Sequence, residues 1–302
     1  MHRIIIITTI MKGKYLNPKA DLTFKKVFGE HPDLVMSLLN ALLPLDEGKQ
    51  IEHVEYLTPE MVPENPGKKN SIVDVRCRET GGRHFIVEMQ MNWNNEFQRR
   101  VILNAAKAVV KQLDKNEEYT LVQPVYALNL INDTGFESGP DEFYHDYAIV
   151  NVAHTDRIIE GLRFVFVELP KFKPQTIAER KMAVLWLRFL TEIDRDTEEA
   201  PAELLENPDT NKALKILEKS AYDEGQLYAY ERFWDAVTTE RVNLESHYKK
   251  GLAEGQAIAE AKWTVKINEK TFEIARNMKA NGLSAEIIAK TTGLTADEIT
   301  KL

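Results

Sequence analysis

Two strands and the turn between them decide the fold of this chain: Ile72-Val-Asp-Val-Arg-Cys-Arg78, Glu79-Thr-Gly-Gly-Arg83 and His84-Phe-Ile-Val-Glu-Met-Gln90. Apolar and polar residues alternate with period two in the first and third stretches, which is typical of half-buried strands. The glycines between them predict a hairpin loop. With that loop, Asp74 lies directly opposite Glu88, and their side chains project from the same face about 5 Å apart at Cβ.

The two faces of this hairpin differ in chemistry. One face is apolar and predicts core: Val73, Val75, Cys77, Phe85, Val87 and Met89. The other face carries Asp74, Glu88 and Gln90. Opposed carboxylates repel each other unless a positive charge sits between them, and Mg²⁺ meets that need with one or two carboxylates. The alternative, which spacing alone favours, is a solvated polar face on which Arg76 or Arg78 neutralises both acids.

Around the hairpin, the pattern predicts an α/β fold with a mixed central sheet flanked by helices. Residues 17–44 indicate two helices that break at Gly29, with Pro32 in the first turn of the second. Further elements are predicted by periodicity, namely strand Ile51–Leu57, loop Thr58–Asn70, helix Phe97–Leu113 and strands Leu121–Ile131, Tyr147–Val152 and Leu162–Leu169. The strand Leu121–Ile131 is so apolar that burial on both of its faces is predicted.

After Phe172 the chain becomes helical. Helices are predicted over Ile177–Ile193, Asn211–Glu240 and Tyr248–Met278, followed by a tail typical of a helix-turn-helix. In that tail, Ser284 and Thr295 are N-cap residues. We therefore expect four regions: an N-terminal extension (1–16), the α/β domain (17–176), a helical region (177–247) and a long helix with the helix-turn-helix-like tail (248–302).

Composition excludes several classes of protein. The 302 residues include 39 Lys and Arg against 47 Asp and Glu, a net charge of −8, so a globally basic nucleic-acid coat protein is excluded. A single cysteine fits a reducing compartment, and we expect a cytoplasmic protein. No apolar run approaches the ~20 residues of a membrane helix, and no glycine-rich phosphate loop occurs, so neither a membrane nor a nucleotide cofactor is expected. The start, Met1 to Ile10, predicts a short edge strand or an upstream start codon ahead of Met11.

Several motifs together carry a family resemblance. They occur in one order: Asp21-Leu-Thr-Phe24-Lys25-Lys-Val-Phe-Gly29, Leu38-Leu-Asn-Ala-Leu, Ser71-Ile-Val-Asp-Val-Arg76, Ile86-Val-Glu-Met-Gln90 and Glu168-Leu-Pro-Lys-Phe172. Each is weak alone, but the ordered set, over roughly residues 17–172, resembles the PD-(D/E)xK nuclease family transposases, also called the recombination-promoting nuclease (Rpn-like) family. The resemblance implies a restriction-endonuclease-like fold.

The same resemblance implies the roles of the hairpin residues. Asp74 and Glu88 would ligate a catalytic Mg²⁺, with Mn²⁺ as an alternative and the Met89 carbonyl as third ligand. Gln90 stands where the wider superfamily often has Lys, and it would orient the attacking water or the phosphate. An amide supplies no positive charge, so the cationic role is left open.

Candidates for that cationic role lie on neighbouring helices. Arg100, Asn104 and Lys107 share one helix face by their spacing, and Arg100 and Lys107 are equally explained as solvated surface charges. Lys25 and Arg76 complete the expected set of phosphate contacts. Asp21 is expected either at the metal site or, slightly favoured, as a helix N-cap.

The resemblance implies a Mg²⁺-dependent DNA endonuclease of the mobile-element kind. Cutting both strands with one active site per chain would favour a homodimer, and the long helix offers a dimerisation surface. Two alternatives stay open: a catalytically silent DNA- or protein-binding relative, and a regulatory adaptor that acts through the tail. Because Thr295 is followed by Asp297 and Glu298, the tail favours partner contact or self-association over sequence-specific readout of bases.

Overall fold

The computed structural model describes residues 13–61, 71–114, 116–174 and 182–302. They form two compact units, Met1–Val237 and Thr238–Leu302, which are described separately. The strand expected over residues 1–10 lies outside the described residues, as does most of the loop expected over 58–70. No helix of the described residues combines the length and apolar content needed to cross a membrane.

Two helices open the first unit, as predicted. A single helical turn, α2 (Asp21–Phe24), runs into a π-helix, η1 (Lys25–Gly29), and α3 (Pro32–Leu42) follows. Pro32 occupies the first turn of α3, where its missing N–H is not needed. Phe24 and Phe28 are fully buried, so this segment packs its apolar stripe into the core.

The sheet is mixed, as predicted. Its six strands are β1 (Val54–Tyr56), β2 (Val75–Glu79), β3 (His84–Gln90), β4 (Val125–Ile131), β5 (Tyr144–Asn151) and β6 (His154–Glu168). They are ordered β1-β2-β3-β4-β6-β5. The β1-β2-β3 and β5-β6 pairings are antiparallel, whereas β3, β4 and β6 run parallel. The last two strands are longer than predicted, because their shared hairpin extends into solvent.

The register of the β2–β3 hairpin is the predicted one. Arg78 pairs with His84 and Arg76 with Ile86. The last pair of the register is Val75 with Val87, and its continuation by one pair places Asp74 opposite Glu88. Since a slip of one residue would exchange the two faces, the apolar residues of the hairpin hold this register.

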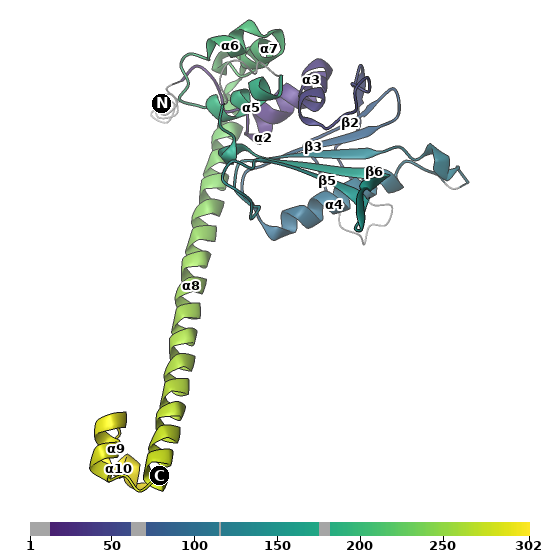
Figure 1. Ribbon diagram of the computed structural model, residues 1–302. Coiled ribbons are helices and arrows are strands. Elements are labelled where there is room, and N and C mark those ends of the chain that lie inside the picture. Colours follow the sequence, from purple (N-terminus) through teal and green to yellow (C-terminus); the bar gives the residue numbers. More distant parts are fainter. Residues whose placement is uncertain (1–12, 62–70, 115, 175–181) are drawn as a thin grey trace. The chain divides into compact units, whose positions relative to one another are not determined.

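Helices cover both faces of the sheet (Figure 1). On one face, α4 (Asn95–Val110) packs Phe97, Val101 and Ala105 against alternate residues of the sheet. The other face carries the larger core, to which α3, α5 (Met182–Glu192), α6 (Ala202–Glu206) and α7 (Pro208–Ile216) contribute. Short 3₁₀ turns lie in the connections: η2 (Tyr119–Leu121), η3 (Leu169–Lys171) and η4 (Lys219–Ala221).

The helix boundaries predicted after residue 210 are wrong. The helix expected over Asn211–Glu240 breaks between α7 and α8, and α8 (Glu224–Ala280) then continues through the expected gap at 241–247. Asp223 and Gln226 explain the start of α8, because each side chain accepts a hydrogen bond from the other's backbone N–H, at 2.8 and 3.1 Å. Residues 241–247 contain neither Gly nor Pro, so nothing in them ends the helix.

The tail has the predicted helix-turn-helix pattern. Ser284 caps α9 (Ala285–Thr292), and Thr295 caps α10 (Ala296–Thr300) in a capping box with Glu298. Gly293 ends α9 with φ of 74°, a left-handed conformation that favours glycine. Ala275, Ile288 and Ile299 form a small core that joins these helices to the end of α8.

Candidate active site

The acid pair lies where β2 begins and β3 ends. Asp74 directly precedes β2, and its Oδ2 accepts a hydrogen bond of 2.7 Å from the backbone N–H of Met89. Glu88, one residue before Met89, is 5% exposed. The N–H and C=O of one strand residue point to the same side, so the Met89 carbonyl lies toward Asp74. The structure therefore brings together the three predicted metal ligands.

Burial makes this pair costly to ionise. It raises the pKa of Asp74, and the pKa of Glu88 is raised by burial first and by the Asp74 charge next. The cations Lys25 and Arg100 act in the opposite direction on both groups. A cation bound between the two carboxyl groups would lower the cost of ionising both, so the pair favours binding of a positive ligand.

Asn104 of α4 contacts the acid pair directly. Its Nδ2 donates to Glu88 Oε1 at 3.2 Å, and the residue is 1% exposed. The helix-face argument placed Asn104 beside Arg100 but did not predict this contact with Glu88. The available signal was a polar residue on the face of the helix that otherwise packs with Phe97, Val101 and Ala105 against the sheet.

Gln90 and Arg100 form the second part of the site. Arg100 Nη2 donates to Gln90 Oε1 at 2.6 Å, and Gln90 Nε2 donates to the carbonyl of Asn92 at 2.7 Å. The Arg100 guanidinium also lies 5.1 Å from the centre of the Phe97 ring. The guanidinium of Arg100, from α4, thus lies beside the side-chain amide of Gln90.

Asp21 does not cap a helix, contrary to the slightly favoured expectation. The N-cap of α2 is Ala20, and Asp21 is the first helical residue. Its Oδ1 instead pairs with Lys25 Nζ at 2.6 Å, the i,i+4 pairing that helical geometry allows. Both charges lie near enough to shift the pKa of Asp74, in opposite directions.

Two of the predicted phosphate contacts lie elsewhere. Arg76 is 9% exposed, and burial lowers its pKa, so its guanidinium is not offered to a large substrate. Lys107 donates to the Met61 carbonyl at 3.3 Å and to Ser71 Oγ at 2.8 Å. The structure thus assembles Lys25 and Arg100 with the acid pair, and it places Arg76 and Lys107 in the surrounding framework.

The donor set fits a hard divalent cation. Asp74 and Glu88 offer carboxylate oxygens and Met89 offers a carbonyl oxygen, which are ligands that Mg²⁺ and Mn²⁺ accept. No group of three or more His, Cys, Asp and Glu side chains gathers among the described residues. A metal here would accordingly take the rest of its ligands from water and substrate, as Mg²⁺ commonly does.

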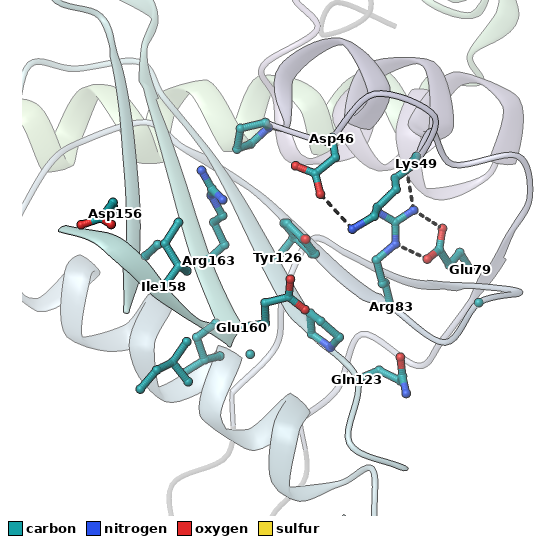
Figure 2. A pocket seen from close by; sticks show the side chains of 17 residues that line it. Asp46, Lys49, Glu79, Arg83, Gln123, Tyr126, Asp156, Ile158, Glu160 and Arg163 are labelled. Atoms are coloured by element: carbon teal, nitrogen blue, oxygen red, sulfur yellow. Dashed lines mark hydrogen bonds and ion pairs between the residues drawn. The ribbon is translucent and has the colours of Figure 1, made fainter. Parts of the chain in front are cut away.

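A separate polar cavity of about 530 Å³ lies at the other end of the sheet (Figure 2). Arg83, which lines the cavity, directly precedes β3. It lies five residues before Glu88, which corresponds to roughly 17 Å along an extended chain. Each cation in its lining is paired with an acid: Lys49 with Asp46, Arg83 with Glu79 and Arg163 with Asp146. Because these charges are already neutralised, the cavity does not compete with the acid pair as the reactive site.

The raised pKa values predict a pH-dependent stability. Between the ordinary carboxyl range and the raised values, the native state binds more protons than the unfolded chain, so the free energy of unfolding falls as pH rises. Glu88→Gln removes this cost and keeps an oxygen for Asn104. We expect this variant, without metal, to match wild type near pH 4 and to exceed it by roughly 1–3 kcal/mol at pH 8.

Urea unfolding in the presence of a chelator, at both pH values, measures this difference. The exposed Glu55, which pairs with Arg78, gives the control Glu55→Gln, for which no pH-dependent gain is expected. A Glu88→Gln variant that is less stable than wild type at pH 8 contradicts the expected cost of the buried pair.

Comparison with known proteins supports the motif reading. A family model described as PD-(D/E)XK nuclease family transposase matches residues 18–246. A second, described as Rpn/YhgA-like nuclease family, C-terminal HTH domain, matches residues 268–302. The search of curated proteins and the search of solved structures each found no match. The resemblance predicted from the ordered motifs is thereby confirmed, as is the helix-turn-helix tail.

Proposed function

We propose, because this chain belongs to the PD-(D/E)XK nuclease family transposases, that it is a divalent-metal-dependent DNA endonuclease of the recombination-promoting kind. One observation carries the proposal: the hairpin register sets the half-buried Asp74 opposite the buried Glu88, and the Asp74 carboxylate accepts a hydrogen bond from the neighbouring Met89 N–H. Such a pair is stable as two anions only with a cation between them. Mg²⁺ is the proposed cation, with Mn²⁺ as an alternative.

Each residue of the site has a proposed role. Asp74, Glu88 and the Met89 carbonyl hold the metal, which when bound polarises the scissile phosphate and lowers the pKa of water. Asn104 fixes the Glu88 carboxylate through its 3.2 Å hydrogen bond. Gln90 orients the attacking water or the phosphate. Arg100, held by Gln90, supplies the positive charge that an amide lacks.

Asp21 and Lys25 are proposed to act at the edge of this site. Their ion pair leaves Lys25 40% exposed, so its ammonium group can exchange Asp21 for a phosphate oxygen of the substrate. Asp21 then remains as an acid close to Asp74, where it adds to the negative field that attracts a metal.

The direct test is cleavage of supercoiled plasmid DNA by the full chain. Nicked or linear product is expected with Mg²⁺ or Mn²⁺ and none with a chelator. Binding of DNA without cleavage under every metal condition would instead support a catalytically silent relative. Absence of both binding and cleavage would support an adaptor that acts through the tail.

Arg100 gives a prediction on substrate binding. Each phosphate contact by a Lys or Arg contributes about 0.9 to the slope of log affinity against log salt. Arg100→Gln should therefore lower that slope by about one unit, measured by fluorescence anisotropy with a labelled duplex in Ca²⁺. The adjacent Arg99 is also exposed and gives the matched control Arg99→Gln, which should change the slope less. Equal slopes for wild type and Arg100→Gln would remove Arg100 from the phosphate contacts.

A homodimer is part of the proposal. On α8, apolar side chains at Val237, Leu244, Ile258 and Val265 follow a seven-residue repeat that is interrupted at Gly251, and the last three are between 45% and 57% exposed. A seven-residue apolar repeat is the pattern by which two helices pair. Sedimentation equilibrium of the full chain distinguishes one copy from two.

A further inference from the structure

The segment that follows Gln90 is fixed by a loop from elsewhere in the chain. Residues 91–94 connect β3 to α4, and they lie against the loop 132–143 that joins β4 to β5. The Gln90 carbonyl accepts a hydrogen bond of 2.8 Å from the Asn132 N–H. The Trp93 N–H donates to Asp133 Oδ2 at 2.8 Å, and its indole packs on Phe136 with ring centres 4.8 Å apart.

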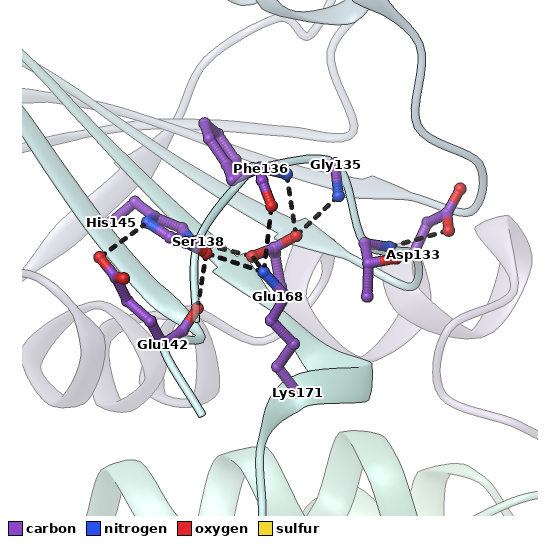
Figure 3. A network of polar contacts seen from close by, with 9 residues as sticks. Asp133, Gly135, Phe136, Ser138, Glu142, His145, Glu168 and Lys171 are labelled. Carbon is purple, nitrogen blue, oxygen red and sulfur yellow. Dashed lines mark hydrogen bonds and ion pairs between the residues drawn. The ribbon is translucent and has the colours of Figure 1, made fainter. Parts of the chain in front are cut away.

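That loop is in turn held by one buried carboxylate (Figure 3). Glu168, at the end of β6, is fully buried, and its Oε1 accepts hydrogen bonds from the backbone N–H groups of Gly135 at 2.6 Å and Phe136 at 3.1 Å. Its Oε2 contacts His145 Nε2 at 2.9 Å and Lys171 Nζ at 2.7 Å.

Lys171 closes the network on the loop. Its Nζ also donates to the Phe136 carbonyl at 3.2 Å and to Ser138 Oγ at 2.8 Å. The buried charges of Glu168 and Lys171 are therefore satisfied by each other and by the loop backbone, which leaves the loop little freedom to move.

Gly135 marks the tightest contact between loop and segment. A Cβ on this residue would lie 1.9 Å from Trp93 Cδ2, so only glycine lets the indole sit here. A Cβ added at Gly139, in the same loop, would have no other atom within 4 Å. The position of the Trp93 indole therefore requires that residue 135 has no side chain.

We propose that the loop 132–143, anchored on Glu168 and Lys171, is a positioning element for Gln90 and Arg100. The connection runs from Glu168 through Gly135 and Asp133 to Trp93, and from Asn92 to the Gln90 amide that holds Arg100. Trp93, Asp133 and Gly135 are positioning residues. The inference rests on the proposed function, since it assigns Gln90 and Arg100 a task on the phosphate.

Metal affinity can serve as the control for this coupling between the loop and the pair Gln90 and Arg100. None of the hydrogen bonds in the chain from Glu168 to Gln90 involves the carboxylates of Asp74 or Glu88. A disturbance of the loop should therefore lower turnover while metal affinity stays constant. A general loss of structure would lower both.

The test compares Gly135→Ala with its matched control Gly139→Ala in the full chain. Because a displacement near 1 Å can cost up to about a hundredfold in rate, we expect Gly135→Ala to lower kcat for plasmid nicking by roughly 10–100-fold. KM should change less than threefold, and Mn²⁺ affinity measured by electron paramagnetic resonance should match wild type. Gly139→Ala should behave as wild type in all three.

A second substitution tests whether Trp93 transmits the effect. In the background Trp93→Phe, the smaller ring makes room for a methyl group at position 135. The loss of kcat caused by Gly135→Ala should then shrink by at least threefold relative to the loss in the wild-type background. Should Gly135→Ala fold poorly, Asp133→Ala removes the acceptor of the Trp93 N–H, with the exposed Asp141→Ala as control.

Hydrogen exchange separates this inference from the proposed function. Gly135→Ala should exchange faster than wild type and Gly139→Ala over residues 91–100, whether or not the protein cuts DNA. If wild type does not cleave, the proposed function fails, and the exchange rates alone decide the coupling. Unchanged exchange, unchanged kcat in an active enzyme, or an equal loss in Gly139→Ala overturns the inference.

Discussion

Asp74→Asn and Glu88→Gln are each expected to lower metal-dependent plasmid nicking by about a thousandfold or more, the largest effect on activity predicted for this chain. The reason is that each carboxylate holds the cation on which the chemistry depends, and loss of that interaction removes about 4 kcal/mol of transition-state stabilisation. Both changes keep the size of the side chain, so the sheet and the Asn104 contact should persist.

The control for this prediction is an acid of the same type outside the site. Asp156 is an exposed residue of β6 in the lining of the separate cavity, and Asp156→Asn should cleave at the wild-type rate. Initial rates of nicking in Mg²⁺ and Mn²⁺ give the comparison. Cleavage that survives in both Asp74→Asn and Glu88→Gln would assign the activity to another site or to a contaminant.

Lys171→Met is expected to give the largest loss of stability, about 3–5 kcal/mol, because it leaves the Glu168 carboxylate buried without its cation. For a unit of this size the change corresponds to a fall in Tm of roughly 6–20 °C. The chain contains a matched control two residues away. Lys173 makes an ion pair with Asp141 in which both side chains are more than 70% exposed, so Lys173→Met should cost less than about 0.5 kcal/mol.

The effect of Lys171→Met should depend on pH in a definite direction. Burial alone would raise the pKa of Glu168, but the hydrogen bonds from Lys171, His145 and two backbone amides together hold it below the ordinary value. The stability from ionised Glu168 is therefore present above the ordinary carboxyl pKa and is lost as pH falls through the lowered one. Thermal unfolding at pH 4 and pH 7.5 should show a smaller gap between Lys171→Met and wild type at the lower pH. An equal cost for Lys171→Met and Lys173→Met would contradict the role given to burial.

The hairpin shows how far local patterns reach. Its strands alternate with period two and its loop contains two glycines, so the pairing of Arg76 with Ile86 follows from counting. The same counting placed Asp74 and Glu88 together. Register in an antiparallel hairpin depends only on neighbouring residues, and for this reason the core of the site could be predicted.

The helices show where such patterns stop. No Gly or Pro interrupts α8 between residues 241 and 247, so the helix continues through them. Its start depends instead on the capping contacts of Asp223 and Gln226. Asp21 satisfies the composition of an N-cap, but the backbone enters the helix one residue earlier, at Ala20. Lys107 shares a helix face with Arg100, yet the packing of α4 directs it to Met61 and Ser71.

Local sequence was enough to predict an α/β fold with an acidic hairpin and a helical tail, because hydrophobic periodicity, turn residues and caps act over a few residues. Folding in three dimensions was needed to bury Arg76, to join Asn104 to Glu88 and to bring Glu168 and Trp93 to one loop. These contacts link residues up to tens of positions apart. Packing and the cost of leaving buried polar groups unpaired decide which residues make these contacts. Both depend on residues that are distant in the sequence, so local patterns do not predict them.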